Sequence, residues 1–215
     1  MTHLEATPGC PTSDGALQDT DTAQSLRMTV VAALMAALIA VGAYLVIPIG
    51  PVPIALQSLF VMLSGLLLAP RWALGAVGVY LLAGALGLPV FAGATGGIGR
   101  FFGPTGGYLV GYLPAVLVVS WTVRRRRAGP ALMVAALVAG TAIVYLFGVA
   151  WLKTVTALPW SKALALGMLP FLPGDAVKIA AALPIARTLR PIVEGAEGKP
   201  ETENWKLGKG TGASV

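Results

Sequence analysis

Histidine and cysteine are almost absent from this 215-residue sequence. The only histidine is His3 and the only cysteine is Cys10, and both precede the first apolar run. A metal site built from His and Cys, a Ser-His triad or a Cys-His pair therefore cannot form within the apolar body of one chain. The sequence also lacks a G-x-x-x-x-G-K-[ST] phosphate loop, so any use of ATP would require a partner that binds it.

Charged residues are scarce as well. They make up 11% of the sequence, against 56% hydrophobic residues, and the mean hydropathy is +0.80. A soluble domain carries about a quarter charged residues, so the composition predicts an all-α protein with several membrane spans. The net charge of +6 does not indicate a nucleic-acid partner, because the basic residues lie at the ends of apolar runs, where they set membrane orientation.

Six apolar segments are compared with the roughly 20 residues that cross a bilayer core. They predict six transmembrane helices in a domain of residues 27–193, namely Met28 to Ile47, Pro53 to Ala69, Trp72 to Leu86, Gly107 to Val123, Ala131 to Leu152, and Asp175 to Leu189. Residues 1–26 and 194–215 lack periodicity and are predicted to be a disordered leader and tail on the cytoplasmic side.

Two stretches fall outside these spans. Gly87 to Gly106 is rich in glycine, and Leu158 to Gly174 contains three prolines. Irregular backbone at membrane depth occurs only where protein or a water-filled cavity satisfies its polar groups. Both stretches are therefore candidate ligand sites.

The distribution of Lys and Arg predicts the orientation, because cytoplasmic loops carry an excess of positive charge. The side of the termini has Arg27, Arg71, the run Arg124 to Arg127, Arg187 and Arg190. The opposite side has Arg100, Lys153 and Lys162, with Lys178 as a possible fourth. Both termini should therefore be cytoplasmic, and both irregular stretches should open outward.

Asp175 is the only acidic residue between residues 22 and 193. An ionisable group within a membrane span costs about 2.5 to 3.5 kcal/mol on insertion scales and indicates a functional site. Pro173 and Gly174 precede it, so Asp175 is predicted to be the N-cap of the last helix, with Lys178 on the same face. The pair could contact a ligand, or it could simply be a helix cap with a local ion pair.

A second cluster of interest runs from Gly96 to Tyr108. Its glycines allow the backbone to approach a ligand, Thr105 can cap the next helix, and Arg100 offers a permanently charged fork suited to a carboxylate. Phe91 and Tyr108 could add an apolar wall. With Asp175 and Lys178, this predicts an outward pocket for a small monoanion that carries hydrogen-bond donors, although a tight extracellular turn would give the same spacing.

Small residues recur at every fourth position in the first span, at Ala32, Ala36 and Ala40, with Ala33 and Ala37 beside them. Such a stripe allows another helix to approach closely. It could serve a partner protein or pack against the chain's own helices.

Four motifs, in order, resemble those of the BioY family over about residues 28–190. They are the run from Pro51 to Val61, the run from Gly87 to Phe91, the run from Gly103 to Tyr108, and the run from Pro173 to Lys178. The resemblance implies the six-helix fold of substrate-binding S components of energy-coupling-factor (ECF) transporters in the prokaryotic cell membrane. It also implies biotin as the ligand, with Asp175, Lys178 and Arg100 as contacts. Further candidate contacts are Gln57, Thr105, Tyr108, Tyr145 and Phe91.

The resemblance implies partners as well: a transmembrane coupling subunit, on which Ala32, Ala36 and Ala40 would dock, and two cytoplasmic ATPases. The chain itself would catalyse no chemical step and need no cofactor. Two alternatives remain open. One is a stand-alone carrier for biotin or another small carboxylate, and the other is an intramembrane transferase that uses Asp175 as a base. The latter lacks a partner carboxylate, histidine or metal ligand.

Overall fold

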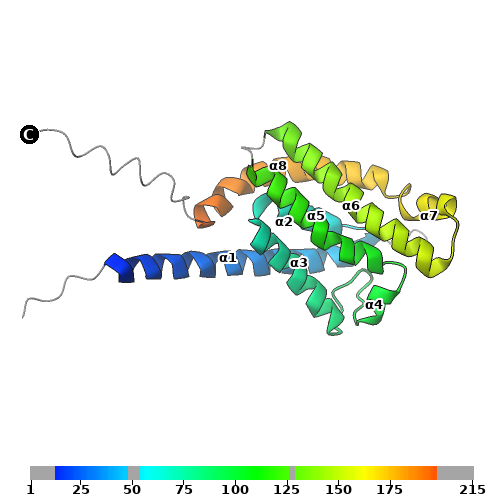
Figure 1. Ribbon diagram of the computed structural model, residues 1–215, viewed down its shortest axis with the longest axis horizontal. Coiled ribbons are helices and arrows are strands. Elements are labelled where there is room, and N and C mark those ends of the chain that lie inside the picture. Colours follow the sequence, from blue (N-terminus) through cyan, green and yellow to red (C-terminus); the bar gives the residue numbers. More distant parts are fainter. Residues whose placement is uncertain (1–12, 48–53, 126–128, 198–215) are drawn as a thin grey trace, which may run out of the picture.

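The computed structural model describes residues 13–47, 54–125 and 129–197, and nearly all of these residues are helical (Figure 1). In chain order the elements are α1 (Ser13–Tyr44), β1 (Val46–Ile47), β2 (Ile54–Ala55), α2 (Gln57–Leu67), α3 (Pro70–Ala85), α4 (Gly99–Phe102), α5 (Gly106–Arg125), α6 (Pro130–Thr156), α7 (Trp160–Gly167) and α8 (Leu172–Glu197). Four predicted features lie outside the described residues: the leader up to residue 12, the run from Pro51 to Pro53, Arg126 with Arg127, and the tail from residue 198.

Each of the six predicted segments overlaps one of the helices α1, α2, α3, α5, α6 and α8. Disorder had been expected up to residue 26, but α1 already begins at Ser13. Ala, Leu, Gln and Arg favour the helix in this stretch. At the other end, α8 continues to Glu197, past the expected end at Leu189.

Two other expectations are wrong in detail: that the first span is helical as far as Ile47, and that the stretch from Leu158 to Gly174 is irregular. The first and second predicted spans meet in an antiparallel strand pair, with Val46 opposite Ala55 and Ile47 opposite Ile54. The β-branched residues there favour extended backbone. The stretch from Leu158 to Gly174 is not irregular throughout, because α7 occupies Trp160–Gly167. Its Ala and Leu residues favour a helix, and Pro159 precedes the first turn, where its missing N–H costs nothing.

Helices α5 and α6 form an antiparallel pair that pack closely because glycines line their contact. Gly111 of α5 faces Phe147 and Val144 of α6, and Gly148 of α6 faces the ring of Tyr108. A methyl group at Gly148 would collide with that ring. Close approach through small residues is how helices associate in membranes without a hydrophobic driving force.

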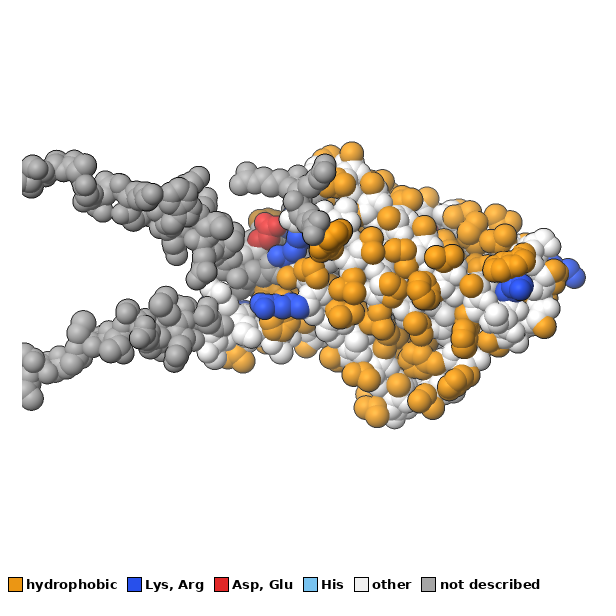
Figure 2. Space-filling view, viewed as in Figure 1, with side chains coloured by type: hydrophobic (Ala, Val, Ile, Leu, Met, Phe, Trp, Pro, Cys, Tyr) orange, Lys and Arg blue, Asp and Glu red, His pale blue; other side chains and the backbone are white. Residues whose placement is uncertain are grey.

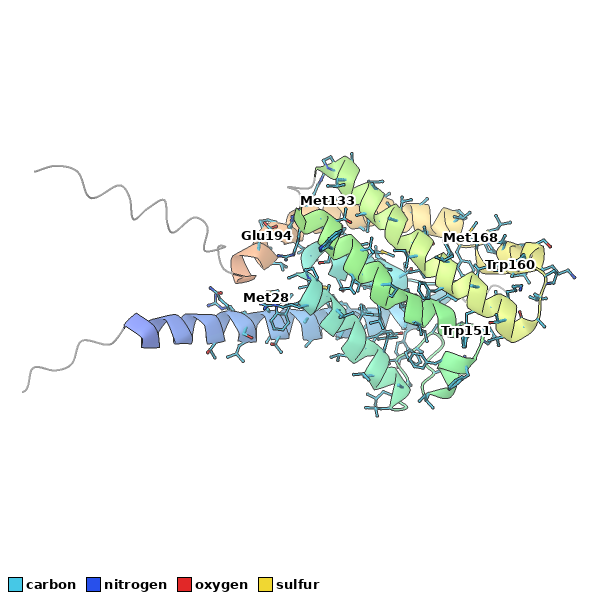
Figure 3. The ribbon with its side chains drawn as sticks, in the orientation of Figure 1. Met28, Met133, Trp151, Trp160, Met168 and Glu194 are labelled. Atoms are coloured by element: carbon cyan, nitrogen blue, oxygen red, sulfur yellow. The ribbon has the colours of Figure 1, made fainter. Side chains whose placement is uncertain are left out.

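The surface between the two ends of the molecule is covered by hydrophobic side chains, while Lys and Arg gather toward the ends (Figure 2). Among the described residues, α1, α5 and α6 are long and apolar enough to cross a membrane, and a fourth span results if α7 and α8, bent by 44°, count as one. Met28, Met133 and Glu194 lie toward one end, and Trp151, Trp160 and Met168 toward the other (Figure 3). The structure is thus an all-helical membrane protein.

Candidate functional site

A cavity lies between α2, α5, α6, α8 and the connection from α3 to α5. All eight residues predicted as ligand contacts line it, namely Gln57, Phe91, Arg100, Thr105, Tyr108, Tyr145, Asp175 and Lys178. These residues come from five separate parts of the chain. Asp175 is the only acidic residue among the described residues that line the cavity.

Asp175 lies within the first turn of α8 and is not the predicted N-cap. The helix begins at Leu172, and the backbone N–H of Asp175 already donates to the carbonyl of Phe171 at 2.8 Å. Pro173 can occupy the first turn because the N–H groups there have no intrahelical partner. The carboxylate therefore benefits from the positive end of the α8 dipole.

Lys178 and Tyr145 fix the orientation of the Asp175 carboxylate. The Lys178 ammonium donates to Asp175 Oδ1 at 3.3 Å, and the Tyr145 hydroxyl donates to Oδ2. Side-chain exposure is 12% for Lys178 and 15% for Asp175. Each carboxylate oxygen thus holds one donor and keeps acceptor capacity for a second.

The Lys178 ammonium is fully engaged by the protein. It also donates to the carbonyl of Ala55 at 2.8 Å and to Ser58 Oγ at 2.9 Å. With Asp175 these partners account for all three ammonium hydrogens. Lys178 therefore ties the start of α8 to the junction of β2 and α2.

Arg100 differs from Lys178 because its guanidinium has no partner among the described residues. It lies in the short helix α4 and is exposed. Within residues 13–47, 54–125 and 129–197, its guanidinium makes no hydrogen bond and no ion pair. The cavity therefore has one uncommitted cation, at its border with the solvent-exposed loop.

Phe91 holds the connection between α3 and α5 in place. Its ring is 3% exposed and makes edge contacts with Tyr80 and Phe101, with centroids 5.6 and 5.7 Å apart. Gly84 of α3 leaves the space that this ring fills. The connection is also held by two side chains that donate to its carbonyls, Tyr44 to Pro89 at 2.6 Å and Trp151 to Gly103 at 3.0 Å.

Thr105 and Tyr108 line the cavity at the start of α5. The Thr105 carbonyl accepts the first helical bond, from the N–H of Leu109 at 3.3 Å. The Tyr108 hydroxyl donates to the carbonyl of Gly167 at 2.7 Å, so it connects α5 to the end of α7. That hydroxyl is therefore already bonded to the protein, although the ring still lines the cavity.

Gln57 is buried, with 3% exposure, and its amide has no hydrogen-bond partner within the described chain. Buried polar groups are rarely left unpaired. Since Gln57 lines the cavity, its amide is available to a ligand.

Four polar lining residues had not been predicted, namely Ser58, Thr95, Tyr112 and Thr141. Tyr112 follows Tyr108 by one helical turn and Thr141 precedes Tyr145 by one turn, so both share a helix face with a predicted residue. Ser58 is the neighbour of Gln57. The four-residue spacing could therefore have identified Tyr112 and Thr141 from the sequence.

The alanine stripe on which a partner was expected to dock lies largely within the chain's own core. Ala32 and Ala36 are 8% and 7% exposed and belong to the chain's own core, and Ala40 packs against that core. Beside the stripe, α1 exposes the small residues Ala33 and Ala37. Of the two possibilities raised by the spacing, Ala32 and Ala36 thus fit internal packing.

No group of three or more His, Cys, Asp or Glu residues that could hold a metal ion occurs in the described part of the chain. The arrangement suits a neutral or anionic organic ligand. Asp175 and Gln57 offer hydrogen-bond acceptors, Arg100 offers a positive charge, and apolar rings enclose the remainder.

Comparison with known proteins places the chain among membrane transporters. A probable biotin transporter BioY of Pyrococcus horikoshii is 41% identical over 158 residues, covering 74% of this chain and 93% of that protein. A biotin transporter BioY of Thermotoga maritima is 39% identical over 167 residues, covering 78% and 98%.

A solved structure also matches. The crystal structure of the S-component for biotin from an ECF-type ABC transporter superposes with a TM-score of 0.74 at 32% identity, covering 78% of this chain and 93% of the other. The family model named BioY family matches residues 16–195. The chain therefore belongs to the BioY family.

Proposed function

We propose that this chain is a biotin-uptake protein, the membrane-embedded S subunit that captures biotin at the outer face. The observation that carries the proposal is the cavity with one oriented carboxylate, Asp175, and one unpaired cation, Arg100. The relatives named biotin transporter and the neighbour described as an S-component for biotin support it.

The chemistry of biotin complements this cavity. Its ureido N–H groups need acceptors, which Asp175 supplies through the remaining lone pairs of both oxygens. Its valerate carboxylate needs a cation. Lys178 is fully engaged by Asp175, Ser58 and Ala55, so Arg100 is assigned to the carboxylate, where a guanidinium fork can bind both oxygens.

The membrane arrangement is part of the proposal. Six helices cross the prokaryotic cell membrane, with both termini in the cytoplasm. The start of α1 and the end of α8 lie at the same end of the molecule (Figure 1), and Arg27, Arg187 and Arg190 lie near those ends in the sequence. The excess of positive charge on that side supports a cytoplasmic location. The loop that carries Arg100 then faces outward.

Transport to the cytoplasm would use an ECF module, in which a transmembrane coupling subunit is driven by two ATPases. The absence of a phosphate loop from the sequence fits this division of labour. A stand-alone carrier would need no such partner. The exposed face of α1, with Ala33 and Ala37, offers a test between these two modes.

Ala37→Leu is expected to reduce biotin uptake strongly while leaving biotin binding unchanged. Ala37 is exposed on α1, so a larger side chain there alters only the outer surface, where close helix approach requires small residues. The matched variant is Ala36→Leu. Ala36 is 7% exposed, and overpacking at this core position should cost about 1 to 3 kcal/mol of stability. Uptake in cells with the ECF module and a thermal unfolding assay would separate the two effects. Full uptake by Ala37→Leu would support a stand-alone carrier.

Direct titration with labelled biotin tests the proposal as a whole. Detergent-purified protein should bind biotin tightly, and desthiobiotin, which keeps the ureido group and the carboxylate, should compete. Lipoate and thiamine should not compete, because lipoate lacks ureido donors and thiamine is cationic. Absence of biotin binding by folded protein would contradict the assignment.

A further inference from the structure

Tyr112 of α5 is a buried tyrosine whose hydroxyl has no partner among the residues that the structure describes. The residue is 8% exposed and lines the cavity. Two neighbouring tyrosines have committed hydroxyls, Tyr108 to the carbonyl of Gly167 and Tyr145 to Asp175. In the described part of the chain the Tyr112 hydroxyl makes no hydrogen bond, whereas a buried tyrosine hydroxyl normally finds a partner. A polar group in this position indicates a ligand contact.

The packing of α5 against α6 sets the depth of Tyr112. Its neighbour Gly111 faces Phe147 and Val144. Tyr112 therefore lies at about the level of Val144 and Tyr145, and the Tyr145 hydroxyl bonds Asp175. Tyr112 and the Asp175 carboxylate thus lie at similar depth on different walls of the same cavity. Arg100 lies in α4, which precedes the first turn of α5.

The ligand group that reaches this depth must form hydrogen bonds with both Asp175 and Tyr112. Asp175 is held as an acceptor by Lys178 and Tyr145, so the ligand has to present N–H groups to it. A ureido head carries a carbonyl oxygen between its two N–H groups, and that oxygen needs a donor. A hydroxyl is suited to this role, since it can rotate its proton toward the acceptor.

We propose that the Tyr112 hydroxyl donates a hydrogen bond to the ureido carbonyl of the bound ligand. This inference rests on the proposed function, because it takes a ureido-containing acid as the ligand. Tyr112 and Asp175 together then select a head in which a carbonyl is flanked by N–H groups, while Arg100 selects the carboxylate at the other end.

The test compares three ligands on Tyr112→Phe, which removes only the hydroxyl. Affinities for biotin and desthiobiotin should each fall about tenfold, as expected for a lost hydrogen bond to a buried group. In 2′-thiobiotin sulfur replaces the ureido oxygen and accepts hydrogen bonds weakly, so its affinity should fall by about twofold or less. The unfolding temperature of the ligand-free protein should not fall, because the hydroxyl bonds to no other group in the described part of the chain.

Tyr80→Phe is the matched control. Tyr80 of α3 is 2% exposed, and its hydroxyl is also unpartnered within the described residues, but it is not among the residues that line the cavity. Its removal should leave all three affinities unchanged.

Three results would overturn the inference: unchanged biotin affinity in Tyr112→Phe, an equal loss for 2′-thiobiotin, or a loss explained by a lower unfolding temperature. Failure of the wild-type chain to bind biotin would instead contradict the proposed function, so the two failures are distinguishable.

Discussion

Asp175→Asn is expected to lower biotin affinity by about two orders of magnitude or more. The substitution removes the negative charge that two ligand N–H groups would share, and a hydrogen bond to a charged group contributes about 1.5 to 3 kcal/mol. It also disturbs the site itself. Lys178 donates to Oδ1 and Tyr145 to Oδ2. The new amide NH₂ must therefore face either the Lys178 ammonium, which cannot accept, or the Tyr145 hydroxyl, which would have to accept instead of donating.

The loss should appear in equilibrium binding of labelled biotin to purified protein. Glu194→Gln serves as the control, because Glu194 pairs with Arg190 at 2.6 Å and is 52% exposed. It lies at the opposite end of the molecule from Trp151 and Trp160 (Figure 3). An exposed pair of this kind contributes little, so its removal should leave affinity unchanged.

Unfolding of the ligand-free Asp175→Asn protein has to be measured as well, because Lys178 loses a partner in a part-buried setting. Some destabilisation is expected. An affinity close to that of the wild type would show that Asp175 only orients α8 and Lys178, and the site assignment would then be wrong.

The sequence predicted the location of the cavity well because its chemistry is rare in this chain. Asp175 is the only acid in the apolar body, and Arg100 follows a run of glycines. Both therefore stand out from an apolar background. The partners of these groups did not stand out, since tyrosine and serine are common in membrane helices. Tyr145 was selected from its position in a span alone, and its bond to Asp175 could be known only from the fold.

The two cations could not be distinguished from the sequence. Lys178 is three residues from Asp175 and Arg100 is far from it in the chain, but both carry one positive charge. The difference comes from tertiary contacts, because Ala55 and Ser58 approach Lys178 from a segment more than 100 residues away. Such contacts leave no local pattern.

The sequence also could not show which face of α1 is buried. Residues 32 and 33 differ by about 100° around a helix, so the stripe of Ala32, Ala36 and Ala40 and the stripe of Ala33 and Ala37 point in different directions. In a soluble helix the polar face would indicate which stripe is buried. In α1 both faces are apolar, since one meets the core and the other has exposed Val30, Leu34 and Val41.

Arg100→Ala is expected to weaken biotin binding by about 10- to 100-fold, through loss of a charge-assisted pair with the carboxylate. The same variant should bind biotin amide, whose tail is uncharged, about as well as the wild-type protein does. The ligand comparison is informative because it separates a local contact from general damage to the site. Arg100→Lys should recover part of the affinity, since lysine keeps the charge but not the planar fork.

Two further variants test whether the loss of biotin affinity is specific to Arg100. Lys153→Ala removes a nearby positive charge that lies over the Trp160 ring, 4.8 Å from its centroid, and is not among the residues that line the cavity, so biotin affinity should not change. Lys178→Ala should weaken biotin and biotin amide alike and also lower the unfolding temperature, because it breaks the link from α8 to Ala55 and Ser58. If Lys178→Ala discriminated against the carboxylate while Arg100→Ala did not, the two roles would have to be exchanged. In that case the ligand carboxylate would have to displace at least one of the three partners of Lys178. The loss of stability of the ligand-free Lys178→Ala protein would then indicate how much these bonds contribute.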